Sequence, residues 1–123
     1  MRSVEIRSKL VDGAGVIYPG PYLNQLRGEG IEKRCHEMLA EGVRHVVINF
    51  EETELVNSIG ISILLSVIEA INDAEGKLVL SNLNSSNHEL FDMLGLLSCI
   101  AVERTEEAAL VKLHEEIGLV ARR

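Results

Sequence analysis

The chain has 123 residues, of which 46% are hydrophobic and 25% are charged, a composition typical of a folded globular domain. Its 19 acidic residues outnumber the 12 Lys and Arg residues, and the net charge of −7 disfavours nucleic acid and anionic membranes as partners. Only 3% of the residues are aromatic, so surfaces on which bases or sugars could stack are scarce. We therefore expect a single domain over residues 1–123, with an aliphatic core and no nucleic-acid partner.

No apolar run reaches the roughly 18 residues that a membrane-spanning helix needs, and no secretory leader follows Met1. We therefore expect a cytoplasmic protein without membrane insertion, in which Cys35 and Cys99 are free thiols. The four His residues are scattered along the chain, which favours no metal site. No Gly-rich phosphate loop is present, and we expect no cofactor.

Alternating polar and apolar residues predict a first strand over residues 4–10, with one face in water. Asp12-Gly13 is a typical two-residue hairpin turn, and it predicts a second strand over residues 15–18. A helix is expected over residues 30–40, because Gly28 and Gly30 weaken an earlier start.

Three strand-and-helix pairs follow, at residues 44–50 with 59–74, 77–80 with 87–94, and 100–102 with 106–117. This alternation predicts an α/β fold with a mixed, mainly parallel sheet, an N-terminal hairpin and about four helices. Ser86 and Glu89 have the spacing of a capping box at a helix start. Gly76, Gly95 and Gly118 are expected to end helices in the left-handed conformation.

Ser58 lies at the junction between the strand over residues 44–50 and the helix over residues 59–74. We expect its hydroxyl to be exposed at the helix N-terminus, where free backbone N–H groups and the helix dipole can receive a phosphate. A Ser at such a position can also serve simply as a helix cap. Catalysis is disfavoured, because Asn57 and Ile59 are too large for a nucleophile turn and no base can be paired with Ser58. We expect no catalytic residues, and hence no enzyme.

The helix that follows Ser58 is apolar nearly all round, from Ile59 to Ile71. Such a helix is either buried on both sides or keeps one face for a partner, and both alternatives remain open. The residues expected to form a partner-binding surface are Asn57, Ser58, Ile59, Gly60, Ile61, Ser62 and Ser66.

The pentapeptide Asn57-Ser58-Ile59-Gly60-Ile61 resembles the signature of STAS domains, the anti-sigma-factor antagonists and their relatives. The resemblance continues in the strand Val46-Val47-Ile48-Asn49, in residues 90–96 and in residues 105–110, so it covers nearly the whole chain. It implies the STAS fold and a regulatory binding module. In such antagonists the Ser matching Ser58 is phosphorylated by an anti-sigma-factor kinase and dephosphorylated by a phosphatase, and the unmodified form binds the anti-sigma factor.

Two positions depart from the family pattern, because Asn57 and Asn49 replace residues that are usually acidic. Three interpretations follow. The first is a regulator that binds an anti-sigma factor or a related serine/threonine-type signalling kinase, with Ser58 as its switch and homodimer formation left open. The second is a phosphorylation-independent STAS scaffold in a signalling or transporter complex. The third is a nucleotide- or lipid-binding STAS domain with a cleft near Ser58.

Overall fold

The N-terminal hairpin forms at the turn that the sequence predicts. In the computed structural model, Asp12 and Gly13 have φ angles of 49° and 88°, which is the left-handed region that a two-residue hairpin turn requires. The turn joins strand β1 (Arg7–Val11) to the antiparallel strand β2 (Ala14–Tyr18). The structure describes residues 5–121, so the predicted strand start at Val4 and the domain ends at residues 1–4 and 122–123 lie outside the described residues.

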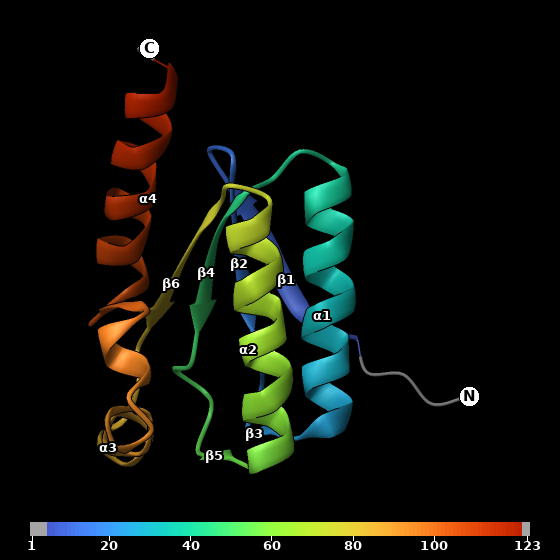
Figure 1. Cartoon of the computed structure of the whole chain (residues 1–123), viewed down its shortest axis with the longest axis vertical. Coiled ribbons are helices and arrows are strands. Elements are labelled where there is room, and N and C mark those ends of the chain that lie inside the picture. Colours follow the sequence, from blue (N-terminus) through green and yellow to red (C-terminus); the bar gives the residue numbers. More distant parts are fainter. Residues whose placement is uncertain (1–4, 122–123) are drawn as a thin grey trace.

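A five-stranded sheet with the order β1-β2-β4-β6-β7 forms the centre of the domain (Figure 1). Strands β4 (His45–Asn49), β6 (Lys77–Ser81) and β7 (Ala101–Glu103) run parallel to β2. The predicted α/β fold with a mainly parallel sheet is therefore confirmed.

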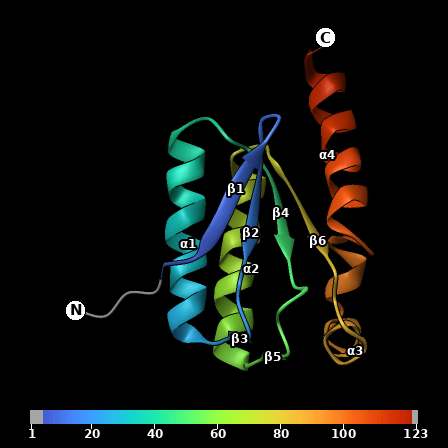
Figure 2. The ribbon, with the colours of Figure 1, turned by 180° about the vertical axis from the view of Figure 1, so that it is seen from behind.

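Helices cover both faces of this sheet. Helices α1 (Gln25–Ala40) and α2 (Ser58–Asp73) pack side by side on one face, while α4 (Glu106–Ala121) crosses the other face, as Figures 1 and 2 show. Helix α3 (Ser85–Met93) and the short 3-10 helix η1 (Leu96–Ser98) connect β6 to β7. The described part of the chain thus contains the four α-helices that the sequence predicts.

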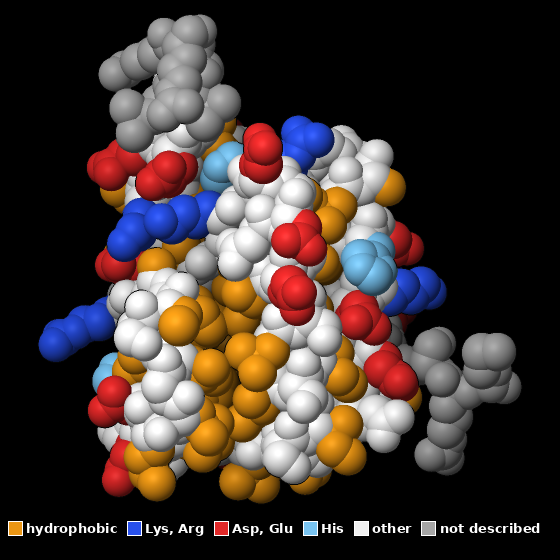
Figure 3. Space-filling model, viewed as in Figure 1, with side chains coloured by type: hydrophobic (Ala, Val, Ile, Leu, Met, Phe, Trp, Pro, Cys, Tyr) orange, Lys and Arg blue, Asp and Glu red, His pale blue; other side chains and the backbone are white. Residues whose placement is uncertain are grey.

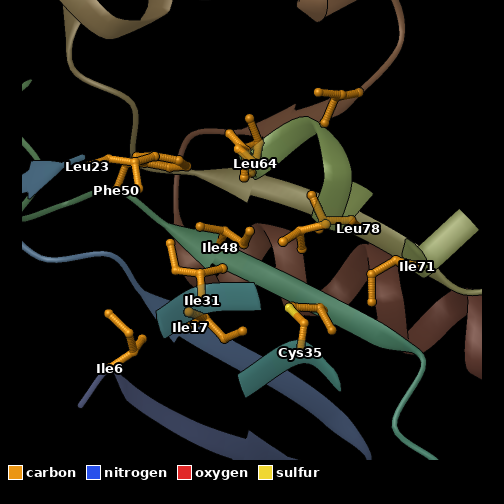
Figure 4. Close-up of a cluster of buried hydrophobic side chains, with 14 of the residues drawn as sticks. Ile6, Ile17, Leu23, Ile31, Cys35, Ile48, Phe50, Leu64, Ile71 and Leu78 are labelled. Atoms are coloured by element: carbon orange, nitrogen blue, oxygen red, sulfur yellow. The ribbon is translucent and has the colours of Figure 1, made fainter. Parts of the chain in front are cut away.

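Two hydrophobic clusters lie on the two faces of the sheet, because neighbouring strand residues point in opposite directions. Ile48 and Leu80 belong to the larger cluster, beneath α1 and α2, parts of which are drawn in Figure 4. Val47 and Val79 point the other way and pack against Ala109 of α4. Burial on both faces explains why these strands are continuously apolar.

Helix α1 begins at Gln25, five residues before the predicted start. Asn24 caps the helix by accepting a hydrogen bond from the backbone N–H of Arg27 at 3.1 Å. Gly28 is tolerated because α2 packs closely there: a Cβ atom at Gly28 would lie 3.0 Å from Cδ1 of Ile63. The glycine that lowers helix propensity therefore allows the two helices to approach each other.

Three further helix-end predictions, at Ser86, Gly76 and Gly118, are wrong. Asn84, rather than Ser86, caps α3, because its side chain accepts a hydrogen bond from the Asn87 N–H at 2.8 Å. Gly95 has the expected left-handed φ of 76°, but after α2 it is Glu75 that adopts a left-handed φ, at 61°. Gly76 instead lies where no side chain fits, because a Cβ atom there would lie 2.0 Å from the Arg44 carbonyl oxygen.

Gly118 also does not end a helix as predicted, because α4 continues through it to Ala121.

The edge-to-face pair of Phe50 and Phe91, with ring centroids 5.8 Å apart, joins the loop after β4 to α3. Both side chains are fully buried. We predict that Phe91→Ala lowers the free energy of unfolding by about 3–5 kcal/mol, because the cavity cannot close fully. Urea denaturation measures the loss. Val111→Ala, at a 58% exposed position on α4, is the control and should change stability by less than about 0.5 kcal/mol. Equal stability of the two variants would contradict this account of the core.

Candidate functional site

A second, two-stranded sheet holds the chain just before α2. Strand β3 (Tyr22–Leu23) pairs in parallel with β5 (Leu55–Val56). The segment before α1 therefore lies beside the segment that follows β4. The Asn57 N–H adds a hydrogen bond to the Leu23 carbonyl at 3.0 Å. Strands of two residues are too short to give a periodic signal, and sequence analysis therefore missed this sheet.

Asn57 is the cap of α2. Its side-chain oxygen accepts a hydrogen bond from the Gly60 N–H at 2.8 Å, and its amide nitrogen donates to the Tyr22 hydroxyl at 3.2 Å. Ser58 is the first residue of the helix and is exposed. The interpretation of Ser58 as a helix cap is therefore wrong, and its hydroxyl is not needed to satisfy the helix end.

Gly60 sets the distance between α2 and β3. A Cβ atom at this position would lie 2.4 Å from the Leu23 carbonyl oxygen, which is far too close for any side chain. Gly60 and Ile61 are buried, so these two members of the predicted partner-binding set face the interior. Asn57 is half-buried, and the other members are exposed, namely Ser58, Ile59, Ser62 and Ser66.

Helix α2 keeps one face in solvent. Leu64, Val67 and Ile71 form part of a buried stripe against the sheet, whereas Ile59 and Leu65 are 50% and 41% exposed. Complete burial of the helix is therefore excluded. Ser58, Ser62 and Ser66 follow one another at four-residue intervals and so lie along the exposed face, one turn apart.

Asn49 belongs to a different polar cluster, on the α4 face of the sheet. Its amide nitrogen donates to Oε1 of Glu106 at 3.1 Å, and its oxygen accepts from the Glu51 N–H at 2.7 Å. Glu106 also pairs with Lys9 at 2.8 Å and accepts a hydrogen bond from the Tyr18 hydroxyl. An Asp at position 49 would place a second carboxylate against Glu106, which explains the amide here.

The titration of this cluster follows from these contacts. Burial alone would raise the pKa of Glu106, but hydrogen bonds from Lys9, Tyr18 and Asn49 together hold that pKa below its usual range. Burial, together with the hydrogen bond to Glu106, raises the pKa of the Tyr18 hydroxyl. At neutral pH the cluster therefore holds an ionised carboxylate and a neutral phenol.

Two hollows of the surface lie away from Ser58. One of about 760 Å³ is bordered by β1 and α1 and includes Ser8 and Arg34, and another of about 730 Å³ lies between α3 and β7. Among the described residues, no group of three His, Cys, Asp or Glu side chains could hold a metal ion. No helix within residues 5–121 is long and apolar enough to cross a lipid bilayer.

These features match one protein family. The STAS domain profile matches residues 5–109, and the chain belongs to the STAS domain family. It is 27% identical over 99 residues to a protein of Bordetella bronchiseptica named as a candidate anti-sigma factor antagonist, BtrV, and the match covers 80% of this chain and 85% of BtrV. It is 28% identical over 70 residues to the anti-sigma F factor antagonist of Paenibacillus polymyxa, covering 57% of this chain and 60% of that relative.

Solved structures confirm the STAS fold. The structure of TM1081 from Thermotoga maritima superposes with a TM-score of 0.81 at 16% identity, over 89% of this chain and 94% of TM1081. The anti-sigma factor antagonist SpoIIAA in its unphosphorylated form gives a TM-score of 0.77 at 20% identity, over 89% of this chain and 96% of SpoIIAA. The phosphorylated form of Bacillus SpoIIAA gives 0.70 at 21% identity, over 87% and 97%.

The close approach at Gly60 gives a testable prediction. Gly60→Ala should lower the free energy of unfolding by about 1–3 kcal/mol, because a backbone carbonyl cannot move aside as a flexible side chain can. Gly118→Ala is the matched control, since a Cβ there meets nothing within 4 Å. Within helix α4 this change should stabilise by about 0.5–1 kcal/mol. Urea denaturation distinguishes the two, and a stabilised Gly60→Ala variant would contradict the packing described.

The Asn49 cluster gives a further prediction. Asn49→Asp should destabilise the protein at pH 7 by about 1–3 kcal/mol, because a carboxylate at the buried position 49 would lie within hydrogen-bond distance of the half-buried Glu106 carboxylate. The penalty should shrink as the pH falls, since the folded variant takes up a proton at a raised pKa while the wild type loses the stability that its depressed Glu106 pKa provides. Urea denaturation at several pH values follows this change.

The control for this prediction is the double variant Asn49→Asp with Glu106→Gln. In it the amide at position 106 can donate a hydrogen bond to the carboxylate at position 49. It should recover most of the lost stability at pH 7. If Asn49→Asp alone is as stable as the wild type at neutral pH, the amide at position 49 is not set by Glu106.

Proposed function

We propose that this protein is an antagonist of an anti-sigma factor, which it binds through the exposed N-terminal part of α2, and that phosphorylation of Ser58 ends this binding. One observation carries the proposal. Ser58 is the exposed first residue of α2, while the neighbouring Asn57 supplies the helix cap. Its hydroxyl can therefore be modified without removing a hydrogen bond that the fold needs.

Apolar side chains lie close to Ser58 in the chain and in the small sheet. Ile59 is 50% exposed, and Tyr22 and Leu55, which are in register across β3 and β5, are 41% and 62% exposed. A partner that covers these side chains would also cover Ser58. Phosphate would add about −1.5 to −2 charges there, and burying that charge against apolar groups is costly.

The relatives support the regulatory part of the proposal. BtrV and the Paenibacillus polymyxa protein are named as antagonists, and SpoIIAA has been solved with and without its phosphate. We carry over to this chain an anti-sigma factor or a related signalling kinase as partner, a phosphatase that restores Ser58, and a place in the cytoplasm. The protein acts by binding, without catalysis of its own.

One observation favours a phosphorylation-independent scaffold as the second candidate. Both polar atoms of the Asn57 side chain already have partners, the Gly60 N–H and the Tyr22 hydroxyl. Asn57 also carries no charge, so it polarises the Ser58 hydroxyl less than an acidic residue would. On this alternative the same surface binds its partner continuously.

Substitution of Ser58 separates the two candidates. Ser58→Glu should abolish binding of the host's purified anti-sigma factor, because a carboxylate at a desolvated contact costs a few kcal/mol. Ser58→Ala should bind like the wild type, and Ser62→Arg should weaken binding without unfolding the protein. Isothermal titration calorimetry measures each affinity, and circular dichroism checks the fold.

Two results would change the proposal. Unchanged affinity of Ser58→Glu would favour the scaffold, since the switch would then be absent. If none of the host's anti-sigma factors binds the wild type, the antagonist function is wrong. Intact-mass measurement of the protein from its host, before and after phosphatase treatment, tests the modification itself.

A further inference from the structure

Strand β1 is an edge of the sheet and is unpaired on one side. Within residues 5–121 it pairs with β2 on one side and with no strand on the other, and it lies beside α1 at the margin of the sheet (Figure 2). Such an edge offers free N–H and C=O groups to a further strand. None of the residues expected from the sequence to bind a partner lies on β1.

The hairpin determines which backbone groups of β1 are free. Val11 and Ala14 are paired on either side of the two-residue turn, and in such a hairpin the pair next to the turn is hydrogen-bonded. Hydrogen-bonded and non-hydrogen-bonded pairs then alternate along the strand, so Ser8 and Leu10 form no hydrogen bond with β2. Their N–H and C=O groups therefore point toward the free edge.

A hollow beside this edge leaves room for a further strand. It has a volume of about 760 Å³, and its lining comes from residues 5–8 and from α1. The Ser8 hydroxyl faces α1, because it accepts a hydrogen bond from Nε of Arg34 at 2.8 Å. Leu10, on the same side of the strand as Ser8, is 53% exposed. An added strand would extend the sheet beside α1 and cover the Leu10 side chain.

The charges at this edge are mainly basic, although the chain as a whole has a net charge of −7. Figure 3 shows acidic side chains along the exposed face of α1 and α2, with Lys and Arg side chains at the margins of the view, one group of them beside α1. The charged side chains of β1 and of the hollow are the basic Arg7, Lys9, Lys33 and Arg34 and the acidic Glu5 and Glu37. Basic groups therefore outnumber acidic ones at the edge, the reverse of the whole chain.

Ion pairs within the protein leave these basic groups accessible. Lys33 is exposed and forms no ion pair with the rest of residues 5–121. Arg7 pairs with Glu52 at 3.4 Å, but the two side chains are 64% and 60% exposed, so exchange for another carboxylate costs little. Lys9 pairs with Glu106 at 2.8 Å and keeps 48% of its side chain exposed. A carboxylate that enters the hollow can therefore gain a partner without breaking a buried contact.

A second copy of this chain fits the edge poorly. Two β1 strands could pair antiparallel about a two-fold axis centred on Lys9 or on Ser8. The first register places Lys9 opposite the same residue of the copy, and the second places Arg7 opposite Lys9 of the copy. Like charges directly opposite each other destabilise a strand pair. A register centred on Leu10 brings Ser8 opposite Asp12 of the turn and shortens the contact.

We infer that the free edge of β1 binds an extended segment of a protein partner, which adds a strand to the sheet and carries acidic residues opposite Arg7 and Lys9. Main-chain hydrogen bonds to Ser8 and Leu10 hold the segment, and an aliphatic side chain covers Leu10. Opposite charges across the strand pair select an acidic segment. The inference goes beyond the proposed function, because none of these residues belongs to the surface around Ser58.

A titration of the whole chain with peptides, followed by amide NMR, tests the inference. Two extended peptides of about eight residues alternate Val with Glu in the first and Val with Lys in the second. The amide signals of Ser8 and Leu10 should shift with the Glu peptide, and their hydrogen exchange should slow, while the Lys peptide should have no effect. Absence of shifts at these residues, or equal shifts with both peptides, overturns the inference.

Variants of the protein locate the contact. Leu10→Pro removes a free N–H group but no hydrogen bond to β2, and it should abolish binding of the Glu peptide, whereas Leu10→Ala keeps the N–H group and should still bind. Lys33→Glu should raise the Kd by about fivefold. Arg104→Glu, at an exposed position after β7 on the opposite edge, is the matched control and should leave the Kd unchanged. Circular dichroism checks each fold.

Backbone methylation of the Glu peptide decides the inference even if Leu10→Pro does not fold. Neighbouring N–H groups of an extended chain point to opposite edges, so N-methylation of all Val residues and N-methylation of all Glu residues block different edges. One of these two peptides should lose binding and the other should keep it. Equal binding by both contradicts strand addition. If sedimentation shows that the wild type alone dimerises and that Leu10→Pro is monomeric, a second copy is the occupant and the inference is wrong.

Discussion

The backbone carbonyl of Leu23 holds the Ser58 region in place. It accepts the hydrogen bond from the Asn57 N–H, and the same residue packs against Gly60 so closely that no side chain fits between them. Strand β3 ends there, and Asn24 then caps α1. One short stretch therefore fixes the start of both helices that cover this face, and the exposure of Ser58 follows from contacts with residues far away in the sequence.

The fold was predictable where the signal is local. The Asp12-Gly13 turn needs only two residues with positive φ, and the alternation of apolar strands with longer helical segments needs only the chain order. The start of α1 was not predictable by the same reasoning. Propensity counts Gly28 as a cost to the helix, while its benefit arises only when Ile63 of α2 packs against it.

The site shows the same limit. Exposure of Ser58 could be expected from its place at a strand-to-helix junction, but Asn and Ser are both good caps, and sequence does not tell which of two neighbours performs that role. The reason for Asn49 was not accessible either, because its partner Glu106 is 57 residues away. A polar residue at the end of an apolar strand is the signal, and it identifies the position without identifying the contact.

The cap supplied by Asn57 has a consequence for how such a protein can carry information. Because Asn57 accepts the hydrogen bond at the start of α2, a change of the side chain at position 58 would remove no capping hydrogen bond from the helix. If the modified side chain were itself the helix cap, each modification would remove the capping hydrogen bond and lower the stability of the fold. The helix cap and the exposed hydroxyl thus belong to adjacent residues, so that on the proposed function the hydroxyl could be modified while the cap stays in place.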